Sequence, residues 1–393
     1  MARSRLALAL SLVVLAACTQ SVAPLKPSSI PSLAASPSPS LSPSPPPAAV
    51  MAPQPIMVTS PRKSPSSFRA GVSLLMYGND VSYQKESAIL FDQLATDNVN
   101  SLSIVFPIYQ SSYYATDPHA DPVHTPSNAE LAWIIQSAKA RGFSVMLRPL
   151  LDERTLYGAP PGGWRGGIQP SSSIAWFASY DALLVSYARF AQAHGVEAID
   201  IGSELDTMER YTYEWPLLIS RLRAVYSGSL TYSSNFEARP IFFGHLLDFI
   251  SVDAYYRISN LKDPTVAQIV EGWQDGGLPD LLNRSRLAGK PVVVTEVGVW
   301  PDNGVFAVTY GGGTHYNPLA QQKFYTATCA ALRPSIRGIY WWYVGLTQQP
   351  VSVSGHDPLS VPGTDQAISA CYAPPFTPPA PLTPFQLHHM TTS

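Results

Sequence analysis

The sequence predicts a (β/α)8 barrel between about residues 68 and 373. Strand-like and helix-like segments alternate eight times there, which favours a closed parallel barrel over an open sheet. No Gly-x-Gly-x-x-Gly motif follows the first strand, so the usual dinucleotide-binding fold is not indicated. Two of the predicted strands lead into a glutamate, Glu204 and Glu296. In a barrel the strands end at one face, where active sites form.

Short apolar or β-branched runs define the strands, and longer segments between them have helical character. In the first half we expect strands at residues 70–75, 101–106, 144–147 and 198–201. Helices are expected at residues 85–97, 127–140, 173–194 and 213–226. Ser127 followed three residues later by Glu130 predicts a capping box at the second of these helices.

The second half continues the same alternation. We expect strands at residues 230–232, 249–252, 291–295 and 338–342. Helices are expected at residues 265–282, 319–332 and 364–372, with a short helix around His245. The strand count completes a barrel whose fourth and seventh strands carry the two glutamates.

The N-terminus reads as a secretion signal that precedes a linker. Residues 1–18 combine Arg3 and Arg5 with an apolar run too short to span a membrane. Leu15-Ala16-Ala17-Cys18 resembles a bacterial lipobox, in which Cys18 is lipidated; a cleaved signal with a chance cysteine is the alternative. Residues 19–67 are rich in Pro, Ser and Ala and predict a disordered tether, and residues 374–393 a disordered tail. We therefore expect a lipid-anchored protein of the cell envelope, on its periplasmic or cell-surface side.

Composition narrows the class of partner. The chain has 25 Lys and Arg against 27 Asp and Glu, a formal net charge of −2, which argues against nucleic acid and against membrane binding other than through the anchor. With 20 Tyr and 8 Trp among few charges, a neutral polar ligand fits better. We expect a monomer. Cys329 and Cys371 form either a disulfide or two small buried apolar side chains.

Glu204 and Glu296 predict glycoside hydrolysis. That reaction needs one carboxylic acid to protonate the leaving oxygen and a second carboxylate as nucleophile or base. A single glutamate at a strand end is often a salt bridge or a solvated loop residue, but two on strands four and seven are hard to explain as chance. No cofactor or metal is needed for this chemistry. A metal site at His119, Asp121 and His124, with or without His315, matches no common zinc spacing.

An ordered series of motifs resembles glycoside hydrolase family 113, whose known members act on β-mannan. The series covers the whole predicted barrel: Val145-Met146-Leu147-Arg148-Pro149, Gly163-Trp164-Arg165-Gly166-Gly167-Ile168, Ile201-Gly202-Ser203-Glu204-Leu205, Leu230-Thr231-Tyr232-Ser233-Ser234-Asn235, Asp248-Phe249-Ile250-Ser251-Val252-Asp253-Ala254-Tyr255, Thr295-Glu296-Val297-Gly298 and Trp341-Trp342. The resemblance implies a retaining double displacement on β-1,4-linked mannan or a related saccharide, with Glu204 as acid/base and Glu296 as nucleophile.

Other residues at strand ends are candidates for substrate binding. Tyr255 is placed to donate a hydrogen bond to the nucleophile, and Arg148, Asn235 and Asp253 could contact sugar hydroxyls or support the site from behind. Strand alternation sends one of Trp341 and Trp342 toward the site as a stacking platform and the other outward. Candidate walls on other loops are Trp164, Tyr109 and Trp300.

The chain departs from the family pattern at three positions. Leu150 stands where many members have His, and Phe236 where they have Trp. Ser203 replaces the Asn that usually precedes the acid/base and addresses the sugar 2-hydroxyl. Two alternatives therefore stay open. One is another activity of clan A, the glycoside hydrolases with glutamates on strands four and seven: a β-glucanase, a β-galactanase or an exo-acting glycosidase. The other is a surface lipoprotein that binds glycan without cleaving it.

Overall fold

The computed structural model describes residues 68–80, 82–160, 163–346 and 357–374. The predicted signal at residues 1–18, the linker at 19–67 and nearly all of the tail at 374–393 lie outside the described residues. None of the helices in the described part of the chain combines the length and the apolar character that crossing a membrane requires.

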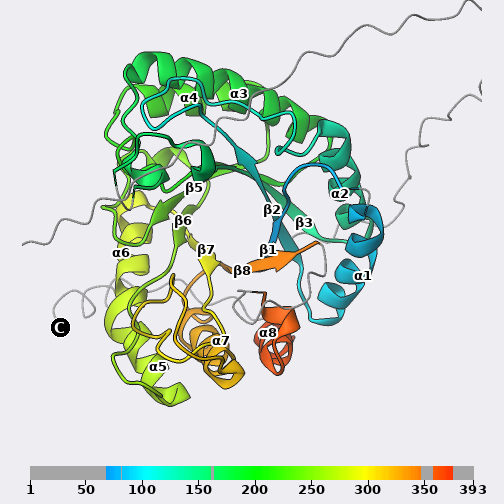
Figure 1. Ribbon diagram of the computed structural model, residues 1–393, viewed down its shortest axis with the longest axis vertical. Helices are drawn as coiled ribbons and strands as arrows, with labels where there is room; N and C mark the ends of the chain where they lie inside the picture. The colour runs from blue at the N-terminus through cyan, green and yellow to red at the C-terminus, as the bar shows by residue number, and fades with distance from the viewer. Residues whose placement is uncertain (1–67, 81, 161–162, 347–356, 375–393) are drawn as a thin grey trace, which may run out of the picture. The chain divides into compact units, whose positions relative to one another are not determined.

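Parallel strands close into a barrel in sequence order, and β1 pairs with β8 to complete it. In Figure 1 they ring the centre of the picture, and the helices lie outside them. The predicted fold class is thereby confirmed. The strands are β1 (Arg69–Leu75), β2 (Ser101–Ile108), β3 (Ser144–Leu151), β4 (Ala198–Ser203), β5 (Ser229–Asn235), β6 (Ile250–Asp253), β7 (Val292–Val297) and β8 (Gly338–Gly345).

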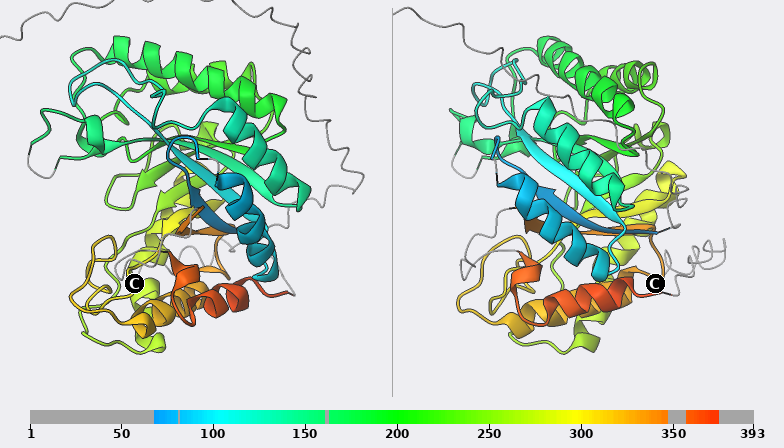
Figure 2. Two further views of the ribbon diagram at one scale, coloured as in Figure 1. Left: turned by 45° about the vertical axis from the view of Figure 1, so that its right-hand side comes forward. Right: turned by 90° about the vertical axis from the view of Figure 1, so that its right-hand side faces the viewer.

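Helices cover the outside of the barrel, as the two further views in Figure 2 also show. They are α1 (Tyr83–Thr96), α2 (Asn128–Ala140), α3 (Ser173–Ala193), α4 (Glu214–Arg223), α5 (Val266–Gly272), α6 (Leu278–Ala288), α7 (Pro318–Leu332) and α8 (Thr364–Tyr372). Between β5 and β6 the described chain has only a short 3-10 turn, η3 (Gly244–Leu246). A π-helical segment, η4 (Trp273–Gly277), joins α5 to α6, so the helix expected at residues 265–282 continues to Ala288.

The predicted capping box at Ser127 is only half formed. The Ser127 hydroxyl accepts a hydrogen bond from the backbone N–H of Glu130, at 3.2 Å. The reciprocal bond is missing, and Glu130 Oε1 has no hydrogen-bond partner among the described residues. A complete box forms instead at the start of α5, between Thr265 and Gln268. A Thr-x-x-Gln pattern carries the same signal as Ser-x-x-Glu, so the sequence did contain it.

Helices α7 and α8 lie side by side in both views of Figure 2 and are joined covalently. A disulfide links Cys329 of α7 to Cys371 of α8, with the two Cα atoms 5.7 Å apart. Of the two alternatives that the sequence left open for these cysteines, the structure contains the bridge.

The interior of the barrel changes from apolar to polar along its axis. An apolar layer fills its lower part and consists of Met146, Ala198, Phe249, Val293 and Tyr340. Two residues further along their strands, inward positions are occupied by buried polar or charged side chains: Arg148, Asp200, Ser251 and Thr295. Since side chains on a strand alternate between faces, the same strands direct their other residues to the helix layer. The polar upper interior supports the site above it.

Candidate active site

Glu204 directly follows β4 and has an unusual backbone conformation. The pairing of β4 with β5 loses its regular register between Asp200 and Ser203, just before it. Glu204 has a φ of 52°, a region that side chains other than glycine seldom adopt. Its backbone N–H donates to the Ser233 carbonyl at 2.8 Å, and the following N–H, of Leu205, donates to the Tyr232 hydroxyl at 2.9 Å. Strand β5 thus holds the backbone of Glu204 in a strained but fixed conformation.

A similar irregularity of strand register, in β7, lets the Glu296 side chain face the interior of the barrel. The register of β7 shifts against β6 at Asp253 and against β8 between Val294 and Val297. Thr295 turns its hydroxyl into the barrel, where it bonds Asp253 Oδ1 at 3.0 Å. Such an irregularity lets the adjacent residue also face the interior, since it breaks the strict alternation of a strand. Glu296 is 6% exposed at the barrel mouth.

Arg148 lies beneath Glu296 and connects four strands. Its guanidinium contacts Asp200 Oδ2 at 3.1 Å, Asp253 Oδ2 at 2.7 Å and Glu296 Oε1 at 2.8 Å. Its Nε also donates to the Ser203 hydroxyl at 2.9 Å. Burial alone would lower the pKa of Arg148, but these carboxyl groups raise it, so the guanidinium stays charged.

The sequence left two roles open for Arg148 and Asp253, and the burial of both side chains favours support of the site from behind over contact with sugar hydroxyls. Both side chains are fully buried below the carboxylates, where no substrate reaches them. They act from behind the site, because Arg148 neutralises Glu296 and Asp253 fixes Arg148. Ser203 faces the same guanidinium with its hydroxyl, at 3% exposure.

The carboxyl groups of the site titrate far above their usual range. Burial raises the pKa of Glu204 to about 7; the Arg165 charge opposes this shift and the Glu296 charge adds to it. Burial and the neighbouring Asp253 raise the pKa of Glu296 to about 7, against the pull of Arg148. Two such carboxyl groups cannot both ionise easily in one buried site. The site therefore holds a proton near neutral pH.

Hydrogen bonds favour Glu296 as the ionised member of the pair. Its carboxylate accepts from Arg148 and, at Oε2, from the Tyr255 hydroxyl at 2.9 Å. Glu204 accepts from Arg165 Nη1 at 2.9 Å and from Asn235 Nδ2 at a long 3.5 Å. Glu296 thus receives two close donors and Glu204 one, and close donors stabilise the charged form. Asn235 ends β5, and Tyr255 lies two residues after the end of β6.

The two tryptophans of β8 face opposite sides of the barrel wall. Trp341 is fully buried and its ring stacks on Tyr325 of α7, with centroids 4.2 Å apart. It therefore points outward and cannot form a sugar platform. Trp342 is half-buried and lies on the inner side, with the Arg148 guanidinium carbon 5.8 Å from its ring centroid. The peptide bond that follows Trp342 is cis.

The loop after β3 brings Arg165, rather than its neighbour Trp164, to the acid/base candidate. The Trp164 ring packs over Gly166, where an added Cβ would lie 2.4 Å from it. Arg165 binds Glu204 and, through Nη2, Glu153 at 3.3 Å. The motif around residues 163–168 pointed to this loop, but it gave no reason to choose the arginine over the tryptophan.

A cavity of about 360 Å3 lies on the side of β1 and β3 and is lined by residues that follow these two strands. Arg165 lines this cavity and contacts Glu204, so one side chain connects the cavity wall with the acid/base candidate. Its lining is polar and charged, apart from one aromatic ring: Tyr77, Asp152, Glu153, Arg154 and Arg165. Sequence reasoning did not select these residues, because a polar loop residue carries no local signal of the wall it will form.

The two remaining wall candidates differ in exposure. Tyr109 is 2% exposed, and its hydroxyl accepts a hydrogen bond from Arg154 Nη2 at 2.6 Å. It therefore lies behind the cavity wall. Trp300 is half-buried and packs against the apolar core.

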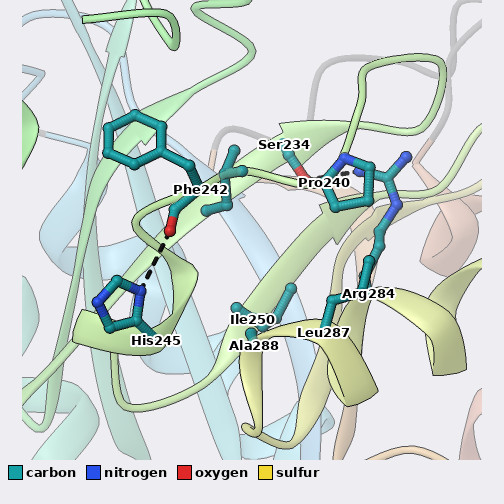
Figure 3. A pocket seen from close by; sticks show the side chains of 9 residues that line it. Ser234, Pro240, Phe242, His245, Ile250, Arg284, Leu287 and Ala288 are labelled. Carbon is teal, nitrogen blue, oxygen red and sulfur yellow. Dashed lines mark hydrogen bonds between the residues drawn. The ribbon is translucent and has the colours of Figure 1, made fainter. Parts of the chain in front are cut away.

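A second cavity, of about 200 Å3, lies away from the glutamates (Figure 3). Ser234 lines it, whereas the next residue, Asn235, points to Glu204, so the cavity opens on the outer side of β5. Figure 3 shows Arg284 reaching from α6 to Ser234, and His245 beside Phe242. This cavity occupies the space next to η3, where a longer helix would cover the barrel.

The histidines considered for a metal site do not converge. His124 Nδ1 lies 2.8 Å from Asp121, while His119 Nδ1 faces the Asp117 carbonyl at 2.6 Å. Within the described residues no three His, Cys, Asp or Glu side chains are grouped so that they could hold a metal ion.

A parallel barrel with one glutamate directly after β4 and a second near the end of β7 defines the class of glycoside hydrolases of this architecture. The particular family follows from the sequence, because residues 74–354 match Glycoside Hydrolase Family 113. The chain belongs to that family and is a glycoside hydrolase. No curated protein sequence matches the chain.

Solved structures of the same family have the same fold. One is a β-mannanase from Alicyclobacillus acidocaldarius, in complex with ManMIm, with 25% identity and a TM-score of 0.66 over 77% of this chain and 97% of that chain. Another, a β-1,4-mannanase, has 21% identity and a TM-score of 0.66 over 78% and 98% of the two chains. A β-glucuronidase from Ruminococcus gnavus shares the fold at 15% identity, with a TM-score of 0.52 over 78% and 50%.

Proposed function

We propose that this glycoside hydrolase cleaves β-1,4-linked mannan, or a related saccharide, with retention of configuration. Glu204 is the acid/base and Glu296 the nucleophile. The observation that carries the proposal is that the two buried carboxyl groups have different hydrogen-bond donors. Glu296 accepts hydrogen bonds from Arg148 and Tyr255, whereas Glu204 accepts one from Arg165. The substrate is taken from the mannanases that share the family and the fold.

The first half of the reaction would use both glutamates at once. Glu204 gives its proton to the glycosidic oxygen while the bond from that oxygen to the anomeric carbon breaks. The Glu296 carboxylate forms a bond to the anomeric carbon, so its negative charge is lost. The raised pKa of Glu204 suits an acid that must hold its proton near neutral pH.

The second half would reverse these roles. Glu204, now ionised, takes a proton from water as the water oxygen attacks the anomeric carbon. The bond to Glu296 breaks, and its carboxylate returns to the contacts with Arg148 and Tyr255. Trp342 is the proposed stacking platform, because an aromatic face at the barrel mouth can pack against the C–H face of a sugar. Asn235 and Trp164 remain proposed substrate contacts.

Another activity of the same clan is the second candidate, and Ser203 favours it. Enzymes of clan A often have an asparagine at this position, which usually addresses the sugar 2-hydroxyl. The Ser203 side chain is shorter, and its hydroxyl accepts a hydrogen bond from Arg148. Recognition of the 2-hydroxyl, which differs in orientation between mannose and glucose, therefore depends on other groups here.

A polysaccharide panel with product analysis tests the proposal. The purified protein should release reducing sugars from β-1,4-mannan, and the first product should carry the β configuration in proton NMR. Glu296→Ala and Glu204→Gln should each lower kcat by about four orders of magnitude or more. Release from β-glucan or β-galactan alone would replace mannan as the substrate. Binding of glycans without hydrolysis by the wild type would contradict the proposal.

The location and oligomeric state are proposals from the sequence. Cys18 and the expected tether at residues 19–67 support a barrel held to the cell envelope by lipid, on the periplasmic or cell-surface side, and we propose that this barrel is a monomer. Cells that express the protein should incorporate labelled fatty acid into the wild type and not into Cys18→Ser. Equal labelling of both would contradict the anchor. Sedimentation of the purified protein as a dimer would contradict the monomer.

A further inference from the structure

The two arginines of the site are held in different ways. Arg148 is enclosed by buried carboxyls, whereas Arg165 lies between a buried and an accessible glutamate. Arg165 Nε donates to the Leu151 carbonyl at 2.8 Å, which fixes the guanidinium. Its Nη1 then lies 2.9 Å from Glu204 Oε2, and its Nη2 lies 3.3 Å from Glu153 Oε1. The Arg165 side chain is 17% exposed and that of Glu153 is 42% exposed.

The shared contacts of Arg165 bear on how Glu204, the proposed acid/base, changes its protonation state. In each turnover Glu204 must be protonated, then ionised, then protonated again. An arginine that pairs with Glu204 alone would favour the ionised carboxylate throughout and weaken it as an acid. A second carboxylate on the same arginine reduces that effect. Glu153 suits this purpose, because water at a partly exposed position stabilises its charge.

We propose that Arg165 is a positioning residue shared by Glu153 and Glu204, and that this sharing lets the acid/base change its protonation state in place. The inference rests on the proposed roles of Glu204 and Glu296. While Glu204 carries its proton, Glu153 balances the charge of Arg165. After Glu204 has given that proton to the glycosidic oxygen, Arg165 balances the new carboxylate until Glu204 takes a proton from the attacking water.

Several other groups act on the charge of Glu204. They come from β3, from β6 and the residues after it, from β7 and from the turn after β4: Arg148, Asp253, Tyr255, Glu296 and Asp206. None of them is altered in the variants below, so a change in the titration of Glu204 reports on Arg165 and Glu153.

The test is the pH profile of kcat/KM, whose basic limb follows loss of the proton from Glu204. Arg165→Gln should move this limb up by about one pH unit, because a nearby positive charge that stabilises the carboxylate is gone. Glu153→Gln should move it down, because Arg165 then pairs with Glu204 alone. Arg165→Lys should return the limb part of the way toward the wild type.

Arg154→Gln is the matched control. Arg154 lines the same cavity, but it pairs with Asp152 and Tyr109 and not with Glu204, so the basic limb should stay in place. A purely structural role of Arg165 would lower kcat without moving the limb. An unmoved limb in Glu153→Gln, or shifts of the same sign in the Arg165 and Glu153 variants, would overturn the inference.

A readout that is independent of activity separates this inference from the proposed function. Isotope-edited infrared spectroscopy follows the Glu204 carboxyl in the folded protein, assigned by its absence in Glu204→Gln. Its titration midpoint should fall in Glu153→Gln and rise in Arg165→Gln. If the wild type hydrolyses no glycan, the proposed function fails, and this titration still decides the inference. If Arg165→Gln does not fold, Glu153→Gln decides it alone.

Discussion

At the scale of single residues, Tyr255 provides a direct test of how Glu296 is kept ionised. Its hydroxyl donates to Glu296 Oε2 at 2.9 Å, a bond that opposes the rise in the Glu296 pKa caused by burial. Tyr255→Phe should therefore raise that pKa, move the acid limb of kcat/KM up by about one pH unit and lower kcat by about tenfold or more. A pH series of initial rates measures both effects.

The neighbouring Tyr256 offers a matched control for that prediction. Its hydroxyl donates to Asp280 at 2.5 Å, on α6 and away from the glutamates. Tyr256→Phe removes the same oxygen without touching Glu296, so the acid limb should not move. If both variants shift the limb equally, the Tyr255 hydroxyl does not act through Glu296.

The residues that sequence reasoning found and missed differ in the kind of signal they leave. Glu204 and Glu296 each end a β-branched run, a local pattern that can be read without the fold. Trp341 and Trp342 could not be told apart, because alternation gives opposite faces but does not say which face is inside. Arg165 was missed, because the contact with Glu204 depends on how a long loop folds back over the barrel.

At the scale of elements, the disulfide between α7 and α8 should stabilise the closing segment of the barrel. Cys329 and Cys371 are separated by 42 residues, and a loop of that length corresponds to about 4 kcal/mol of lost entropy in the unfolded chain. Cys329→Ser with Cys371→Ser should therefore lower the free energy of unfolding by an amount of that order. Urea unfolding measures it.

Reduction of the wild type provides the control for this prediction. Unfolding in the presence of a reductant should approach the stability of the double variant, and the double variant itself should not respond to the reductant. Since the disulfide lies on the outer helices, kcat at low temperature should hardly change. A double variant as stable as the oxidised wild type would contradict the prediction.

The order of the elements could be predicted from the sequence, while some of their ends could not. Each strand has an apolar run of its own, so the predicted strand ends lie within a few residues of the observed ones. The helical run from α5 to α6 ends at Ala288, beyond the expected end at residue 282, and a π-helical segment at Trp273–Gly277 joins its two parts. Strand β3 extends through Pro149 to Leu151, beyond the expected end at residue 147.

At the scale of the whole molecule, Arg148 ties four strands of the barrel together through charge. It binds carboxyls of β4, β6 and β7 from its place on β3, with no exposure to solvent. Arg148→Met should destabilise the fold by about 4 kcal/mol near neutral pH, because buried carboxyls lose their counter-charge. Lysine should restore little of this, since an ammonium cannot reproduce the planar fork of contacts.

The loss of stability in Arg148→Met should also depend on pH, with a definite sign. Burial already raises the pKa of Asp200, Asp253 and Glu296 in the folded protein, and removal of the arginine raises them further. The folded variant then binds more protons than its unfolded chain does, so its stability falls as pH rises from about 4. The difference from the wild type should therefore be small at pH 5 and large at pH 8, as measured by urea unfolding at both values.

Arg284 separates this charge effect from the simple loss of a buried side chain. It is 3% exposed, but apart from Asp280 it donates to neutral groups: the Ser234 hydroxyl and the carbonyls of Phe236 and Ala238. The charge of Arg284 lowers the pKa of Asp206 and Glu209 without a direct bond to either, so Arg284→Met should destabilise the barrel with a weaker dependence on pH than Arg148→Met. A barrel that loses as much stability at pH 5 as at pH 8 on Arg148→Met would show that Arg148 acts by packing. In that case the ion pairs of Arg148 would not be what connects β3 to β4, β6 and β7.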